Sequence, residues 1–254
     1  METKTLSTKK LEGQESFIKM SKSLMDTKKL GKNGELDVYH LAIIKSLANN
    51  FQGMAYTGVT HIMKFIGMST EQNITKTRAK ESLLNLQERG HIEIYKDKAM
   101  LTTVTEIKNA ENYFIRPTGK DEEFGFAKVF YTDIQRINGM KSDYKPKVFA
   151  TYLNMVGNIF YSLSNVPMSY MKIDTIVKGT GISRRSVVGY LKALHEYEIL
   201  YFVHFHINNS ISKNYCTRWI HKKHTVEWAL SEAEFQFKTT KEQFKGGAEG
   251  VSEE

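Results

Sequence analysis

The sequence is poor in cysteine and proline: Cys216 is the only cysteine, and three prolines occur among 254 residues. A single cysteine cannot close a disulfide within the chain, and it excludes a structural zinc site built from a cysteine cluster. This usage is typical of the reducing cytoplasm, which is where we expect the protein. The opening segment "METKTLSTKKLEGQESF" has no apolar core, so we expect no secretory signal.

Long apolar runs are also scarce. The longest uncharged run, Val148 to Met171, contains several asparagines and serines and a proline, which are costly to bury in lipid. We therefore expect a soluble protein with no membrane span.

The sequence also has little that points to an enzyme. The stretch "PTGKDEE" lacks the earlier glycine and the hydroxyl residue after lysine that a phosphate-binding loop needs. His204 and His206 alternate on an expected strand, and His221 and His224 lie three apart, but no cysteine or carboxylate is placed to complete a zinc site. We expect no catalytic activity, no metal and no cofactor.

Positive charge is abundant and unevenly placed. The net charge is +8 and the isoelectric point is about 9.3, which favours an anionic partner such as nucleic acid. Residues 1–33 carry eight lysines and four acids, residues 171–224 carry nine basic and three acidic residues, and residues 225–254 carry three lysines and seven acids. The positive excess thus lies in the N-terminal arm and in the segment 171–224.

An internal repeat occurs at an offset of 108 residues. "NITKTRAKESLLNLQERGHIEIY" (Asn73 to Tyr95) aligns with "GISRRSVVGYLKALHEYEILYFV" (Gly181 to Val203), which pairs Ile74 with Ile182, Leu83 with Leu191 and Leu86 with Leu194. The same offset pairs Leu41 and Ala42 with Phe149 and Ala150. We infer two copies of one structural unit, since a repeat constrains the architecture more than a single motif does.

Each copy predicts three helices followed by a β-hairpin. Apolar spacing predicts first helices at 36–51 and 147–163 and second helices at 59–66 and 170–178. A third helix follows in each copy, and we expect Thr75 and Ser183 to cap these two helices through their hydroxyl groups. The β-rich runs "HIEIY" with "MLTTV", and "LYFVHFHI" with "YCTRWIH", complete the copies. This is the order of a winged helix-turn-helix, so the expected fold class is mainly α with small β-hairpin wings (α+β), in two tandem domains.

The third helix of the second copy has two faces. Val187, Leu191 and Leu194 form an apolar stripe at helical spacing. Arg185, Gly189 and Lys192 fall on another face. A basic face on a capped helix predicts contact with DNA phosphates and with base edges in the major groove.

One stretch of the chain resembles a known family. The segment "FGFAKVFYTDIQRI" (Phe124 to Ile137), followed by a helix and by "MKIDTIVKGTGISRRSVVGYLKALHEYEIL", resembles the winged-helix domains of plasmid and phage replication initiator proteins of Gram-positive bacteria. In that family a strand of pattern F-x-K-V-y opens a unit that ends in a tGiS…v…yl..L recognition helix. The resemblance covers residues 124–224 and, more weakly, 36–105. It implies a bacterial protein, associated with a plasmid or the nucleoid, that binds repeats at an origin and recruits host replication proteins.

The candidate DNA-binding residues come from both copies. In the second copy Arg185 is expected to read a base, and Lys213 and Arg218 to supply charge at the wing. Glycine in a helix costs about 1 kcal/mol relative to alanine, so Gly189 either allows close approach to DNA or is merely tolerated. The full set is Ser183, Arg184, Arg185, Ser186, Gly189, Tyr190, Lys192, Asn209, Lys213 and Arg218, with Thr75, Lys76, Thr77, Arg78 and Lys80 in the first copy.

The expected organisation leaves several alternatives open. It comprises a basic flexible arm (1–33), a first winged helix (34–110), a linker (111–123), a second winged helix (124–225), and a C-terminal helix with an acidic disordered tail (226–254). The first copy binds a second DNA half-site, binds weakly, or serves as a dimerisation module of a homodimer. For the whole protein, a transcriptional regulator at promoter operators and a protein–protein adaptor are the alternatives to replication initiation, because MarR-like and GntR-like regulators share the GIS…L..L pattern.

Overall fold

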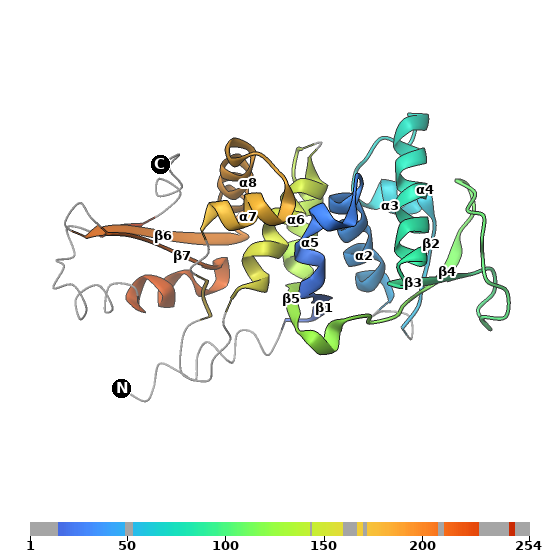
Figure 1. Cartoon of the computed structure of the whole chain (residues 1–254), viewed down its shortest axis with the longest axis horizontal. Coiled ribbons are helices and arrows are strands. Elements are labelled where there is room, and N and C mark those ends of the chain that lie inside the picture. The colour runs from blue at the N-terminus through green and yellow to red at the C-terminus, as the bar shows by residue number, and fades with distance from the viewer. Residues whose placement is uncertain are drawn as a thin grey trace. The chain divides into compact units, whose positions relative to one another are not determined.

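The computed structural model has a mixed α+β fold with small antiparallel sheets, as the sequence predicts (Figure 1). It divides into an N-terminal unit, residues 17–150, and a C-terminal unit, residues 151–254 together with 1–16. The structure describes residues 15–48, 53–142, 144–159, 167–169, 172–207, 211–228 and 244–246, with side chains omitted at 204–207, 211–214 and 244–246. Among these residues, no helix combines the length and the hydropathy that a membrane crossing requires.

The N-terminal unit is built on a long helix and a three-stranded sheet. The helices are α2 (Gly34–Ala48), α3 (Val59–Phe65) and α4 (Asn73–Glu88), and the strands are β2 (Ala55–Thr57), β3 (Ile92–Tyr95) and β4 (Tyr113–Pro117). The sheet is antiparallel in the order β2-β4-β3, and α4 packs against α2 and α3 (Figure 1). Leu83 and Leu86 of α4 and Ile94 of β3 are buried, so the two leucines that the repeat pairs with Leu191 and Leu194 belong to the core.

The predicted flexible arm is structured where it is described. Phe17–Ser21 forms β1, which pairs antiparallel with β5 (Phe126–Phe130), and the short 3-10 helices η1 (Lys22–Met25) and η2 (Thr27–Leu30) follow. Leu24 and Thr27 are buried. The prediction of a flexible arm over 1–33 is therefore wrong from residue 15 onward, because alternate residues of β1 are apolar and pack inward. Residues 1–14 lie outside the described part of the chain.

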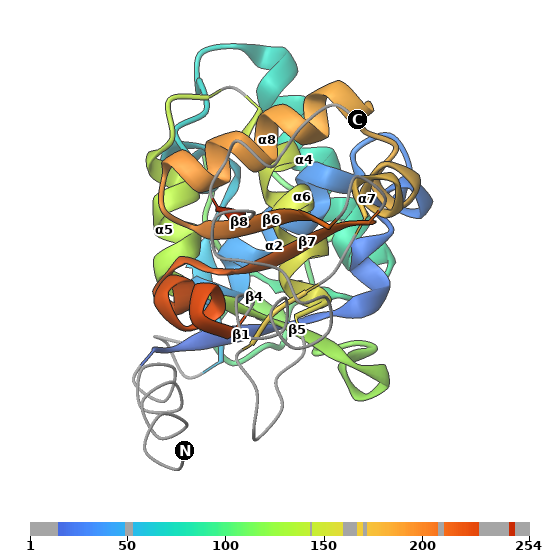
Figure 2. The same ribbon diagram turned by 90° about the vertical axis from the view of Figure 1, so that its left-hand side faces the viewer.

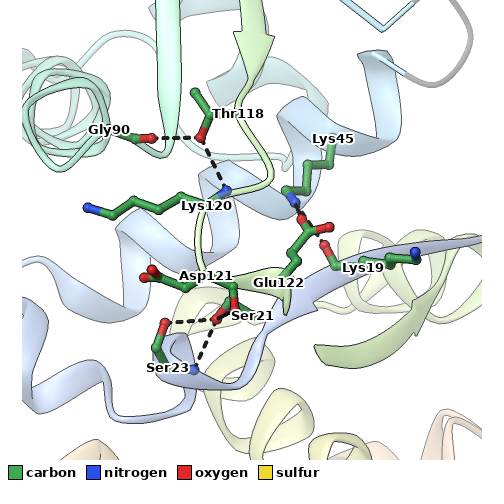
Figure 3. Close-up of polar contacts among 9 residues, drawn as sticks. All are labelled: Lys19, Ser21, Ser23, Lys45, Gly90, Thr118, Lys120, Asp121 and Glu122. Atoms are coloured by element: carbon green, nitrogen blue, oxygen red, sulfur yellow. Dashed lines mark hydrogen bonds and ion pairs between the residues drawn. The ribbon is translucent and has the colours of Figure 1, made fainter. Parts of the chain in front are cut away.

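The predicted linker 111–123 contains β4, the central strand of the sheet. Its polar end is held by several hydrogen bonds (Figure 3). Thr118 donates to the carbonyl of Gly90 at 2.6 Å, and Lys120 Nζ donates to the carbonyl of Arg89 at 2.6 Å. The linker prediction is therefore wrong: these residues tie the end of β4 to the end of α4. The predicted partner of β3, "MLTTV", makes only an isolated bridge, between Tyr95 and Thr103.

An ion pair joins α2 to the turn after β4. Lys45 pairs with Glu122, which belongs to the short helix η3 (Glu122–Phe124), and Figure 3 shows the two side chains pointing toward one another. Lys45 Nζ also donates to the backbone carbonyl of Lys19 at 2.9 Å. One ammonium thus links α2, β1 and this turn, after which β5 and α5 (Tyr131–Gly139) continue the unit.

A buried polar cluster lies between α2 and α4. His40 Nδ1 and Ser82 Oγ are 3.0 Å apart, and Asn85 donates to Asp37 at 3.5 Å. Burial raises the pKa of Asp37 to about 6, although hydrogen bonds from Ser82 and Asn85 lower it. Burial also lowers the pKa of His40 to about 3, so this imidazole is neutral at pH 7.

Because the pKa of Asp37 is raised, we expect Asp37→Asn to stabilise the protein by an amount that increases with pH. The ordinary pKa is 3.8 and the folded value about 6, so the folded state takes up a proton in this window and the wild type loses stability as pH rises from about 4 to 6. The variant lacks this loss, and its free energy of unfolding should rise by about 2 kcal/mol relative to wild type between pH 4 and pH 7. Urea unfolding at both pH values measures it; a difference independent of pH would contradict the assignment.

The C-terminal unit places two helices against a β-hairpin. It contains α7 (Ile173–Thr180), α8 (Arg184–Glu196), β6 (Leu200–Ile207) and β7 (Ile211–Arg218), and the helix α6 (Lys145–Gly157) runs through the division at Ala150. β6 and β7 lie side by side in an antiparallel pair (Figure 2). Ser169 forms an isolated antiparallel bridge with Cys216 of β7, on the edge of β7 that does not pair with β6.

The predicted C-terminal region, 226–254, is ordered in two places. Residues up to 228 continue a short helix, and Phe244–Gly246 forms β8, which pairs antiparallel with β6. The prediction of a disordered tail is therefore wrong for β8, where backbone pairing with the edge of β6 outweighs the acidic composition. The rest of the tail lies outside the described residues.

Helices α4 and α8 end alike, at positions that the predicted repeat pairs. The N–H of His91 donates to the carbonyl of Leu86, and the N–H of Ile199 to that of Leu194, each at 2.9 Å. The residues before these donors have positive φ, 74° at Gly90 and 56° at Glu198, which is 108 residues further on. Both helices therefore end in the same left-handed turn, which redirects the chain into the following strand.

Candidate nucleic-acid interface

The turn between α7 and α8 is defined by local hydrogen bonds. Gly181 has φ 71°, and its N–H donates to the carbonyl of Val177 at 2.9 Å, which closes α7. The Ser183 hydroxyl accepts from the N–H of Ser186 at 3.2 Å, so Ser183 caps α8 as predicted. Ile182, between them, is buried. The apolar anchor and the cap together set where α8 begins.

The two faces of α8 are separated as the sequence predicts. Val187, Leu191 and Leu194 are buried, and so is Val188. Arg185, Gly189 and Lys192 are exposed and fall on one face of the helix. Among the described residues no carboxylate forms an ion pair with Arg185 or Lys192, which leaves both cations toward solvent. Ser186 and Tyr190 are half-buried at the border of this face.

Arg184 has a partner that the sequence did not indicate. Its guanidinium pairs with Asp174 of α7 at 2.5 Å, and both side chains are accessible to solvent, at 39% and 75%. The pair joins the first turn of α8 to α7. Asp174 lies in the first turn of α7 and Arg184 at the start of α8, ten residues further on, and no local pattern indicates this pair. Arg184 is thus a link between α7 and α8 as well as a surface cation.

No neighbouring group requires glycine at position 189. A Cβ atom built there meets nothing within 4 Å, and α8 continues through this position. Glycine therefore leaves a small flat area between Arg185 and Lys192. Packing within the described chain provides no reason for it.

Arg218, predicted to contact DNA from the wing, lies instead at the base of the β6–β7 hairpin. Arg218 is 1% exposed and pairs with Glu15 at 2.6 Å, at the end of β7 opposite Leu200. The prediction that Arg218 contacts DNA is wrong, because its guanidinium is buried at the base of the hairpin and not at its tip. Lys213 lies in β7 opposite Phe205, with its side chain outside the description, and Asn209 lies outside the described residues.

An aromatic cluster supports the base of the same hairpin. His195 of α8 packs its ring against Tyr201 at 5.6 Å and against Trp219 at 5.0 Å, measured between ring centroids. Lys222 Nζ lies 4.6 Å from the centroid of Trp219. Burial, followed by the charge of Lys222, lowers the pKa of His195. The cluster therefore anchors the last turn of α8 to β6 and orients the helix.

In the first copy the structure changes the role of Thr75. The helix α4 begins at Asn73 with Gln72 as its cap, and the Thr75 hydroxyl donates to the side chain of Gln72 at 3.3 Å. The prediction that Thr75 caps this helix is wrong, since α4 starts earlier in the repeat than α8 does. Thr75 instead lines a cavity of about 340 Å³ beside the buried Lys145.

The remaining candidates of the first copy lie on a helix of mixed charge. Thr77 and Arg78 are exposed, and Lys76 and Lys80 are half-buried. Two exposed acids on the same helix, Glu81 and Glu88, offset these cations. Ile74 is 71% exposed, although its repeat partner Ile182 is buried. This helix therefore presents a weaker positive surface than α8.

The described residues contain no group of three or more histidine, cysteine or acidic side chains that could hold a metal ion. His221 is fully buried and Cys216 is a buried free thiol. Comparison of the chain with protein-family models, with curated proteins and with solved structures finds no match.

The buried Arg218 and the exposed Arg184 predict different losses of stability. Arg218→Met removes one partner of a buried ion pair and should lower the free energy of unfolding by about 3 kcal/mol. Arg184→Met removes a solvent-screened pair and should cost less than about 1 kcal/mol. Urea unfolding of the two variants at pH 7 compares them, and equal losses would contradict this difference in burial.

Proposed function

We propose that this chain is a sequence-specific double-stranded DNA-binding protein with two winged-helix units, and that it acts as a replication initiator at a plasmid or phage origin. The observation that carries the DNA-binding proposal is the exposed face of α8, where Arg185, Gly189 and Lys192 lie together. The helix is capped by Ser183, and its opposite face is buried. Replication rests on the sequence resemblance alone.

The order of elements supports the winged-helix proposal. In the N-terminal unit a helix, a short strand, two helices and two strands follow one another, and the sheet order is β2-β4-β3. In the C-terminal unit α6, the bridge at Ser169, α7, α8, β6 and β7 repeat this order. In such an arrangement the third helix is the element that enters the major groove.

The charges of α8 support contact with DNA by this helix rather than by α4. Helix α8 contains three basic residues and one acid, so its net charge is 3 − 1 = +2, and the acid, Glu196, is its last residue. Arg185 is one turn from Gly189, where the missing side chain lets a groove wall come close. Arginine there can donate to both acceptors of guanine, while Lys192 neutralises a phosphate.

Substitution of Arg185 tests the base contact. Arg185→Ala should weaken binding to a selected duplex by about 1–3 kcal/mol and relax the preference at one base pair. Arg185→Lys keeps the charge but loses the two-pronged hydrogen bond, so it should also lose preference while keeping most of the nonspecific affinity. Gel-shift titration and footprinting measure both, with substitution of the exposed Lys32 by alanine as a charge-matched control; a wild-type footprint for Arg185→Ala would remove the assignment.

Gly189→Ala separates stability from binding. Alanine should stabilise α8 by about 1 kcal/mol, because it favours the helix and its Cβ meets open space. If the helix face lies against DNA, the same methyl group should weaken duplex binding. Thermal unfolding and gel-shift titration of one preparation give both values, and a variant that is more stable with unchanged affinity would contradict close approach at Gly189.

A further inference from the structure

The β1–β5 ribbon has one apolar face and one face that combines aromatic rings with cations. Ile18, Met20, Ala127 and Val129 are buried on the inner face. The alternate residues Phe17, Lys19, Phe126 and Lys128 have partly or fully exposed side chains. The ten residues of the two strands include two lysines and no acid. The outer face therefore carries charge of one sign together with two rings.

The arrangement of these four side chains is symmetric. Lys19 and Lys128 are directly opposite one another in the antiparallel register. Lys19 Nζ lies 4.9 Å from the centroid of Phe126, and Lys128 Nζ lies 5.3 Å from that of Phe17. "FIKM" in β1 and "FAKV" in β5 have the same pattern, so the two lysines meet at a local two-fold axis that relates Phe17 to Phe126.

Two like charges directly opposite on neighbouring strands are normally unfavourable. Their contacts with the rings offset part of that cost, since an ammonium is attracted to the face of an aromatic ring, and Lys128 makes a further interaction besides. An anion bound between the lysines would offset more of it. The side chains lie about 5 Å apart across the strands and about 7 Å apart along them, so a ligand that presents both a phosphate and a flat ring suits the face.

The position of Lys19 keeps its side chain available for such a ligand. Its backbone carbonyl accepts the hydrogen bond from Lys45, whereas its side chain extends away from the Lys45–Glu122 pair (Figure 3). Glu122, an acid of that group, is neutralised by Lys45. Phe124, two residues before β5, is 83% exposed and adds a third ring near this end of the ribbon.

We propose that the outer face of the β1–β5 ribbon binds single-stranded nucleic acid. Bases stack on Phe17 and Phe126, and backbone phosphates lie against Lys19 and Lys128. Rings interleaved with cations are what sequence-tolerant single-strand binding requires, because every base has a π-face and every linkage a charge. The proposal is independent of duplex recognition by α8, and it adds a second nucleic-acid contact on another part of the chain.

Fluorescence anisotropy with labelled oligo(dT) tests the proposal on the full chain. An abasic oligonucleotide of equal length should bind wild type at least about tenfold more weakly than oligo(dT), because it offers phosphates but no bases to stack. Phe17→Leu/Phe126→Leu should weaken oligo(dT) binding by about tenfold. Lys19→Ala/Lys128→Ala should reduce the slope of log affinity against log salt by about 1.4. Lys28→Ala/Lys32→Ala, which removes the same charge at two exposed residues elsewhere, should leave oligo(dT) affinity near wild type.

Several outcomes would overturn the proposal. Equal affinity for oligo(dT) and the abasic strand, a result that needs no variant, would reduce the surface to a nonspecific anion patch. Equal losses of oligo(dT) affinity in Lys19→Ala/Lys128→Ala and in the matched lysine control would also reduce the surface to a nonspecific anion patch. Arg185→Ala separates the two nucleic-acid proposals, because it should leave oligo(dT) binding unchanged. A loss of oligo(dT) affinity in Arg185→Ala as large as that in the ribbon variants would overturn the assignment of single strands to the ribbon.

Discussion

Burial of the apolar stripe on α8 determines which of its side chains meet solvent. Once Val187, Leu191 and Leu194 are packed inward, rotation of the helix is excluded, and Arg185 and Lys192 must face outward. The cap at Ser183 and the left-handed turn at Glu198 bound the helix at its two ends. His195, stacked on Tyr201 and Trp219, anchors its last turn. The basic face is therefore a consequence of core packing.

Features governed by neighbours in the sequence could be predicted, and those governed by distant partners could not. The cap at Ser183 and the two faces of α8 follow from spacing within one helix. Arg218 looked like a surface cation, but its partner Glu15 is 203 residues away, and no local pattern indicates such a pair. The prediction that Thr75 caps α4 is wrong because α4 begins at Asn73, so Thr75 already lies within the first turn of the helix.

The segment 111–123 explains why the domain boundaries were misplaced. Its proline, glycine and charges are typical of an exposed loop, and they concealed the alternation of Tyr113 and Ile115, which are buried in β4. Thr118 and Lys120 then bind the carbonyls that end α4. The polar residues of this segment are thus structural, and they join the strand, α4 and β1 into one unit.

Selection of DNA fragments from a bacterial or plasmid library by the purified chain, read out by sequencing, tests the central proposal of sequence-specific duplex recognition most directly. We predict enrichment of fragments that share a short sequence, present as direct repeats in or beside the chain's own gene. A single palindrome within promoters would contradict the replication role but retain DNA recognition. Recovery of fragments at their input frequencies, with no common sequence, would contradict sequence-specific binding itself.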